Sequence, residues 1–107
     1  MHVDDLAIAI GYLLKLKVNN NKKLLKLIKI NSLINVGSGQ EFHVKKFAQI
    51  INKLTLSNKK LRFNKKFPDG TKRKILDISI IKKIGWKSKI NLYDGLRNTI
   101  GWYKMNY

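Results

Sequence analysis

The stretch MHVDDLAIAIGYLLKLK (residues 1–17) predicts a helix that is apolar on almost every side. Acidic side chains stand in its first turn and lysines in its last, where charges of those signs interact favourably with the helix dipole. From Leu6 to Leu16 the sequence is apolar nearly all round, interrupted by Gly11. A helix of this kind is normally buried between other elements. One short domain can scarcely bury it, so the stretch predicts that further structure packs against it.

Outward from this helix, the sequence predicts a mixed α/β arrangement made mainly of helices with a few short strands. A polar connector (18–31) leads to a short strand at 33–36, and a second strand is expected at 60–64. The apolar spacing of 44–56 indicates a helix. A short helix is expected between Asp77, as its N-cap, and Gly85, as its stop, and a last helix over 91–107.

The composition favours one soluble domain. The chain has 107 residues, 44% of them hydrophobic, which is typical of a globular protein. It has no cysteine, which excludes disulfides, a thiol nucleophile and a cysteine zinc site. No apolar run approaches the roughly 18 residues that cross a membrane, and the first residues lack a signal-peptide layout. We therefore expect a cytoplasmic protein with no membrane partner.

The charge is strongly basic, with a formal net charge of +17. Clustered lysines neutralise phosphates, so a small basic nucleic-acid-binding module is the alternative function. Only three of the cations are arginines, the residue type that base-edge recognition favours. The excess of lysine accompanies an excess of isoleucine and asparagine, as an AT-rich coding sequence would produce. We interpret most of the charge as solvated surface and expect no nucleic-acid partner.

Several other motifs carry no chemistry. GSGQEF (37–42) lacks the third glycine of a dinucleotide fingerprint and is better explained as a tight turn. His2 and His43 do not cluster with the few acids, so no metal site is expected. His43 is expected to be an imperfect helix cap, and His2 to lie beside Asp4. The tryptophans and tyrosines at helical spacing favour core packing over base stacking.

The segment PDGTKRKILD (68–77) places an acid in a turn just before three consecutive cations, Lys72, Arg73 and Lys74. One interpretation is a surface turn followed by a capped helix. The other is a loop that binds an anionic ligand bearing hydroxyl groups. A nucleotide sugar suits this pair, because a carboxylate accepts hydrogen bonds from ribose or base while cations face the diphosphate.

The order of five sequence features resembles the C-terminal third of the GDP-L-fucose synthases, over essentially the whole chain. The first two motifs are shared by many nucleotide-sugar epimerases, whereas the third is much more specific. The features are HVDDLA (2–7), INVGSG (34–39), PDGTKRKILD (68–77), GWKSKINLYDGL (85–96) and Trp102.

The resemblance implies an extended short-chain dehydrogenase/reductase, of which residues 1–107 form the C-terminal substrate-binding portion. An NADP-dependent enzyme of this family converts GDP-4-keto-6-deoxy-D-mannose to GDP-L-fucose by epimerisation and reduction. By the same resemblance, Asp69 matches the substrate-contacting acid, and Lys74 and Arg73 match basic positions of the loop. Two departures, Lys72 in place of a proline and Phe67 in place of a lysine, suggest a less rigid loop with redistributed charge.

The family's catalytic machinery is absent from the sequence, which has neither G-x-x-G-x-x-G nor Tyr-x-x-x-Lys. The N-terminal Rossmann domain, which binds NADP, is therefore not in this chain. We expect the chain alone to bind no cofactor and to be inactive. A truncated gene, a split gene product and an incomplete reading frame are all open origins. The implied partners are a GDP-sugar, with another nucleotide sugar as the alternative, a second copy as in the homodimeric family enzymes, and a separately encoded N-terminal part.

Overall fold

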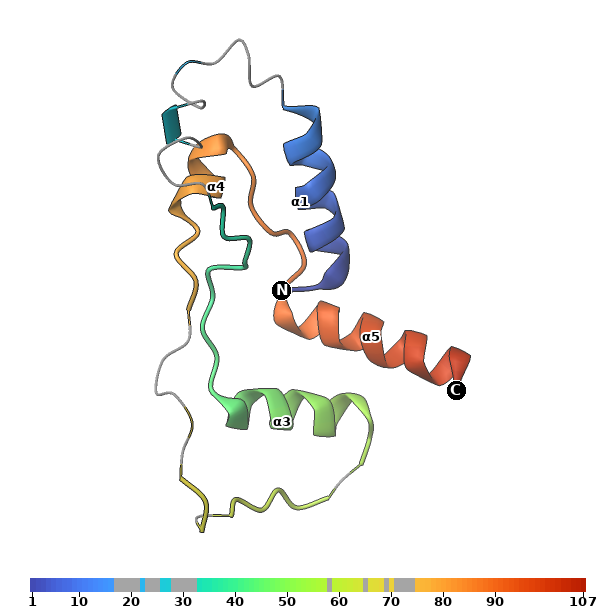
Figure 1. Cartoon of the computed structure of the whole chain (residues 1–107). Helices are drawn as coiled ribbons and strands as arrows, with labels where there is room; N and C mark the ends of the chain where they lie inside the picture. The colour runs from blue at the N-terminus through green and yellow to red at the C-terminus, as the bar shows by residue number, and fades with distance from the viewer. Residues whose placement is uncertain are drawn as a thin grey trace. The chain divides into compact units, whose positions relative to one another are not determined.

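Four helices have their full course within the residues that the computed structural model describes (Figure 1). Those residues are 1–16, 22, 26–27, 33–57, 59–64, 66–68, 70 and 75–107. The helices are α1 (Val3–Lys15), α3 (Val44–Leu54), α4 (Ser79–Ile84) and α5 (Leu92–Asn106). The chain divides into two compact units: a first unit of Met1–Gln40 with Leu76–Asn91, and a second unit of Glu41–Ile75 with Leu92–Tyr107.

The two predicted strands, 33–36 and 60–64, are wrong. Neither segment has regular secondary structure, and the described residues contain no strand. A strand forms when a neighbour exchanges backbone hydrogen bonds with it, and neither segment has such a ladder partner in the described part of the chain. Ile34 and Val36 instead pack, partly buried, against the core of the first unit. The helical part of the predicted mixed fold is therefore confirmed, whereas its strands are not found in the described residues.

The core of the first unit is small. Among the described residues it consists of Ala9 from α1, Ile81 from α4, and Ile78 and Trp86 on either side of α4. The segment after α4 runs back along α1 (Figure 1). Near the C-terminal end of α1 the Tyr12 hydroxyl donates to the Ile84 carbonyl oxygen at 2.9 Å. The predicted core position is thus confirmed for Trp86, which is 6% exposed.

Helix α1 lies within the stretch that predicts it, residues 1–17, and ends at Lys15, but it is not buried on every side. His2 is its N-cap, and the His2 ring nitrogen Nδ1 accepts from the Asp4 amide at 3.3 Å. Only Asp5 and Ala9 are buried along its length. These positions and Tyr12 follow the spacing i, i+4, i+7 and so form one stripe facing the core. The opposite side of the helix, which is also apolar, remains exposed.

Short local interactions fix both ends of α4. The Asp77 carboxylate accepts from the Ser79 amide at 2.9 Å, so Asp77 satisfies a free donor of the first turn as predicted. The N-cap position itself falls one residue later, at Ile78. Gly85 ends the helix in the left-handed region at φ 105°, as its sequence predicts.

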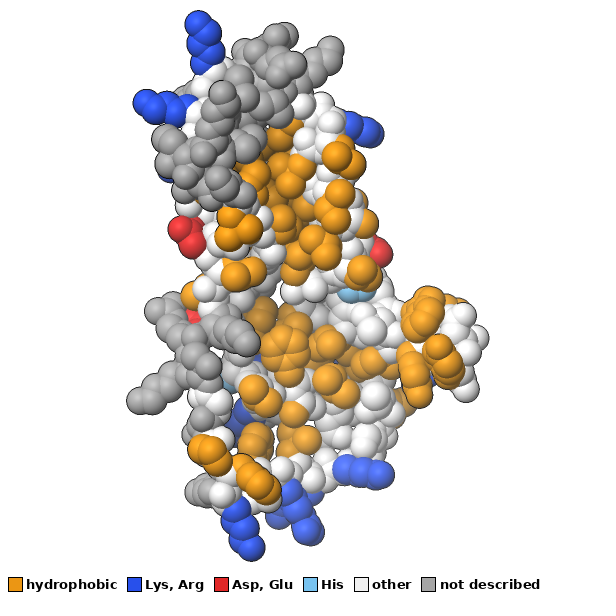
Figure 2. Space-filling model, in the orientation of Figure 1, with side chains coloured by type: hydrophobic (Ala, Val, Ile, Leu, Met, Phe, Trp, Pro, Cys, Tyr) orange, Lys and Arg blue, Asp and Glu red, His pale blue; other side chains and the backbone are white. Residues whose placement is uncertain are grey.

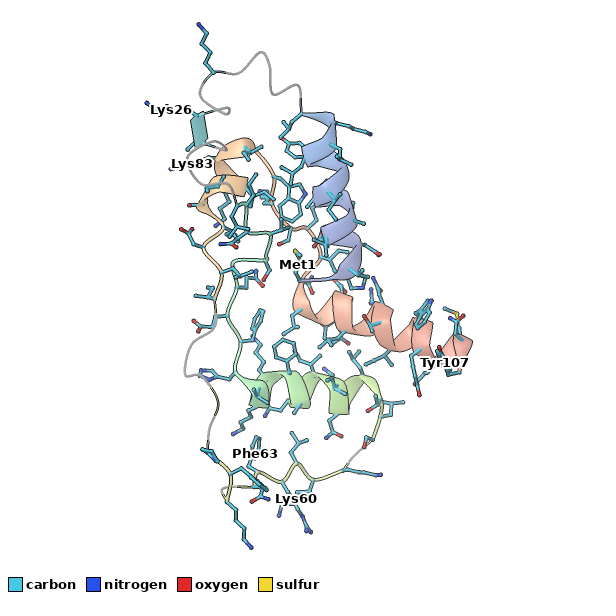
Figure 3. The ribbon with its side chains drawn as sticks, viewed as in Figure 1. Met1, Lys26, Lys60, Phe63, Lys83 and Tyr107 are labelled. Atoms are coloured by element: carbon cyan, nitrogen blue, oxygen red, sulfur yellow. The ribbon has the colours of Figure 1, made fainter. Side chains whose placement is uncertain are left out.

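The second unit is formed by α3 and α5, which contact each other. No residue of α3 is fully buried, and Phe47 and Ile51 on its predicted apolar face are 37% and 40% exposed. The prediction that Tyr93, Trp102 and Tyr103 are core residues is wrong, because they are 41%, 56% and 60% exposed. Trp102 and Tyr103 lie near the end of the chain. Both rings instead contact Tyr107, the labelled last residue (Figure 3), with centroid distances of 6.1 Å and 5.3 Å.

Candidate functional site

The three predicted site residues, Asp69, Arg73 and Lys74, lie outside the described residues. Within the same motif the structure describes Pro68, Gly70 and residues 75–77. Gly70 is exposed, with no heavy atom within 4 Å of where a Cβ would lie. The C-terminal end of the motif, from Leu76 onward, belongs to the first unit. Residues 76–85 are therefore the described segment that borders the candidate site on its C-terminal side.

Asp77, the last residue of the PDGTKRKILD motif, anchors this border. Its backbone carbonyl accepts from the Asn35 side-chain amide at 3.2 Å, which links it to the INVGSG segment. Its exposed carboxylate bonds the backbone amide and the hydroxyl of Ser79, which lowers the pKa of the Asp77 carboxyl below its ordinary value. The positive charge of Lys83, labelled in Figure 3, lowers this pKa further. Asp77 is therefore held as an anion that caps α4.

Of the two glycines of INVGSG, Gly39 is explained by its backbone conformation and by close packing against Ile78. A Cβ added to Gly37 would lie 3.4 Å from the Ile78 side chain. At Gly39, which has φ +66°, an added Cβ would lie 2.5 Å from the Ile78 side chain, closer than any real contact. The same added Cβ would lie 3.7 Å from the Lys82 ammonium nitrogen, so a cation stands beside this glycine. The positive φ and the close packing explain Gly39 without a dinucleotide.

A buried carboxylate joins the first and last motifs of the first unit. Asp5 is 1% exposed, and its oxygens accept from the Lys89 amide at 3.1 Å and 3.2 Å and from the Ile90 amide at 2.9 Å. Sequence reasoning assigned Asp5 only to the helix dipole and missed this role. The available signal was its spacing, because Asp5 shares one helix face with Ala9 and Tyr12.

The four motifs therefore contact one another in two pairs within the first unit. HVDDLA (2–7) binds the GWKSKI segment (85–90) through Asp5. INVGSG (34–39) binds Asp77, the last residue of PDGTKRKILD, through the Asn35 side chain. Each pair joins segments that are far apart in the sequence. The arrangement holds the C-terminal end of the cationic loop against a fixed glycine-containing segment.

The histidines lie where the sequence predicts. The His2 side chain is 10% exposed, and its Nδ1 lies 3.4 Å from an Asp4 carboxylate oxygen. His43 is the N-cap residue of α3 and makes no side-chain capping bond. In the part of the chain that the structure describes, no three His, Cys, Asp or Glu side chains are grouped so as to hold a metal ion. None of the described helices has the length and apolarity to cross a membrane.

The chain is similar over almost its whole length to proteins named as GDP-L-fucose synthases. No family model matches it. It is 37% identical over 106 residues to "Probable GDP-L-fucose synthase 1" of Oryza sativa subsp. japonica, 35% over 108 residues to "GDP-L-fucose synthase 1" of Arabidopsis thaliana, and 34% over 110 residues to "GDP-L-fucose synthase" of Escherichia coli (strain K12).

Each of these matches covers 99% of the chain, and the chain spans 29% of the length of the two plant relatives and 32% of that of the bacterial one. The motifs whose residues contact one another in the first unit are four of the five features that carried the resemblance in the sequence. The chain therefore belongs to the GDP-L-fucose synthase family, of which it represents the C-terminal part.

Proposed function

We propose that this chain contributes nucleotide-sugar binding to a GDP-L-fucose synthase-type enzyme, an NADP-dependent epimerase and reductase that makes GDP-L-fucose from GDP-4-keto-6-deoxy-D-mannose. The observation that carries this proposal is the 34–37% identity to GDP-L-fucose synthases along 99% of the chain. The cationic loop supports it, because an acid and three cations within six residues suit a sugar diphosphate.

In this proposal Asp69 accepts hydrogen bonds from the sugar nucleotide, while Lys74 and Arg73 face its diphosphate. Pro68 presets the backbone of the turn and Gly70 can adopt a positive φ, so the carboxylate between them stands on a short loop. The described border supports the arrangement, because Asp77 caps α4 and thereby fixes the C-terminal end of the loop. A loop fixed at one end loses less conformational freedom when a ligand binds.

The cofactor belongs to another part of the enzyme in this proposal. The sequence contains no glycine-rich fingerprint and no Tyr-x-x-x-Lys pair, so its residues do not fit NADP. This chain then supplies substrate binding, while a part corresponding to the remaining two thirds of the relatives supplies cofactor binding and catalysis. That part, a GDP-sugar and a second copy of the complete enzyme are the proposed partners.

A chimera tests the role of the loop. This chain replaces the matching segment of the Escherichia coli relative, and GDP and UDP are titrated into the chimera by calorimetry. A hydrogen bond to a charged group contributes roughly 1.5 to 3 kcal/mol, so Asp69→Asn and Asp69→Ala should weaken GDP binding about ten- to a hundredfold. The control is Lys59→Ala, because Lys59 is exposed and lies outside the motif. Equal GDP affinities for the parent chimera and all three variants would remove this role.

The net charge of +17 favours one alternative, a nucleic-acid-binding module. Such a module would lose affinity by orders of magnitude between low and physiological salt, because each neutralised phosphate releases counterions. We expect only weak binding of the purified chain to DNA or RNA at physiological salt. Tight binding that persisted there and preferred one nucleotide sequence would favour the alternative over the enzyme.

A further inference from the structure

Helix α1 carries a second apolar face, on the side away from the core of the first unit. It is defined by Val3, Leu6, Ile10 and Leu14, which are 69%, 38%, 50% and 82% exposed. These positions follow the spacing i, i+3, i+7, i+11 and therefore lie along one side of the helix. In Figure 2, drawn in the orientation of Figure 1, hydrophobic side chains gather over α1. We call this set the outer face of α1.

The charge pattern separates the outer face from ordinary solvated surface. The chain contains 23 lysines and arginines, yet none stands in residues 1–14. The exposed positions of the other helices do carry cations, such as Lys45 on α3 and Lys82 on α4. The lysines of α1 are confined to its last residue, Lys15, and the outer face carries none. An exposed apolar face of this kind marks a surface that another apolar surface covers. The outer face thus has the composition of an interface.

Two occupants compete for this face: a second copy of the chain and a different polypeptide. Two copies would each bring a net charge of +17 to the same contact, and this mutual repulsion disfavours a self-paired face. A different polypeptide is favoured by the length of the relatives, since the chain spans only 29–32% of them. The relatives therefore contain a large further part that can cover the face.

We propose that the outer face of α1 docks onto the part of a GDP-L-fucose synthase-type protein that this chain does not match, either on the same polypeptide or on a separate one. The inference rests on the proposed function and assigns the contact to particular residues. The complementary surface is apolar along the helix.

The test mixes the full purified chain with a purified polypeptide that comprises the part of the Escherichia coli GDP-L-fucose synthase outside the matched segment; the corresponding rice polypeptide is a second probe. Calorimetry measures the affinity, and sedimentation measures the self-association of the chain. The variants are Ile10→Lys and Leu14→Lys. The matched control is Met105→Lys, because Met105 is 81% exposed and, like Leu14, is the second-last residue of its helix. Circular dichroism verifies that every variant folds like the wild type.

We expect a one-to-one complex whose dissociation constant rises at least tenfold in Ile10→Lys and Leu14→Lys and less than twofold in Met105→Lys. Three results would overturn the inference: no binding of the wild-type chain to either probe, equal affinities for all variants, or a self-association that only the α1 variants abolish. Titration of GDP into the complex separates this inference from the proposed function. Docking that depends on α1 without GDP binding contradicts only the function, and GDP binding with docking unaffected by the α1 variants contradicts only the inference.

Discussion

Replacing Asp5 should destabilise the first unit more than replacing its neighbour Asp4. The Asp5 carboxylate is buried and accepts from two backbone amides, those of Lys89 and Ile90, at 2.9 to 3.2 Å. Asp5→Ala removes the acceptor and leaves both amides without it. An amide left unsatisfied costs about 1 to 3 kcal/mol. The two amides are only partly buried and water can reach them, so we take the lower half of this range for each.

The expected loss is therefore about 2 to 4 kcal/mol in the free energy of unfolding for Asp5→Ala. Asp5→Asn keeps one carbonyl oxygen but turns an NH₂ group toward a backbone donor, so it should lose about 1 to 1.5 kcal/mol. Asp4 has a side chain that is 67% exposed, and its carboxylate lies 3.4 Å from the His2 ring nitrogen Nδ1. Asp4→Ala should cost about 0.3 to 1 kcal/mol, mainly through the helix dipole.

Urea unfolding followed by circular dichroism measures these differences, and amide hydrogen exchange locates them. In Asp5→Asn the amide of Ile90 should exchange faster than in the wild type, whereas Asp4→Asn should leave that amide unchanged. This readout stays informative if Asp5→Ala proves too unstable to fold. Equal losses for Asp4 and Asp5 variants, or unchanged exchange at Ile90, would refute the tethering role assigned to Asp5.

Two further predictions concern local geometry and pH. Gly39→Ala should lower the free energy of unfolding by about 1 to 3 kcal/mol, because φ is +66° there and the new Cβ meets Ile78. Gly11→Ala has open space around it and should raise the free energy of unfolding by about 0.5 to 1 kcal/mol. Thermal unfolding of both variants checks these changes, and a stabilised Gly39→Ala would contradict them. The pKa of Asp77 is lowered by its bonds to Ser79, so its stabilisation is present above the unfolded pKa and is lost as the pH falls below about 4. Asp77→Asn, which keeps a capping oxygen, should flatten this part of the stability profile, and an unchanged acid limb in urea titrations would argue against the cap.

Helix positions could be predicted from the sequence because their signals are local. The apolar spacing of α1 and α3, the cap at Asp77 and the stop at Gly85 depend on residues within one or two turns. The strand at 33–36 was predicted from its apolar composition, which a buried extended segment shares with a strand. What distinguishes the two is a partner strand distant in the sequence, and that information is not local.

The resemblance predicted which motifs form the candidate site, but the contacts between these motifs could not be predicted from the sequence. Asp5 and Asp4 are adjacent acids in one turn, yet one is buried and the other is 67% exposed. Their difference depends on which helix face meets residues 89–90, more than eighty positions later in the chain. Periodicity could have ranked them, since only Asp5 shares the face of Ala9 and Tyr12. The identity of the donors, two backbone amides, leaves no mark in the sequence.

The tether at Asp5 and the exposed outer face of α1 both follow from the small amount of apolar surface that the first unit buries. Among the residues that the structure describes, the first unit buries only four apolar side chains, so their hydrophobic stabilisation is small and the bonds of Asp5 make up a large part of what holds α1 in place. A helix that is apolar all round but buried on one stripe alone leaves most of its apolar surface in water. Covering the outer face adds to stability by linkage, about 2.7 kcal/mol when the partner is at a hundred times its dissociation constant. That gain is about as large as the loss expected for Asp5→Ala. The inner tether therefore orients α1, and the proposed partner supplies the apolar burial that a chain of this size lacks.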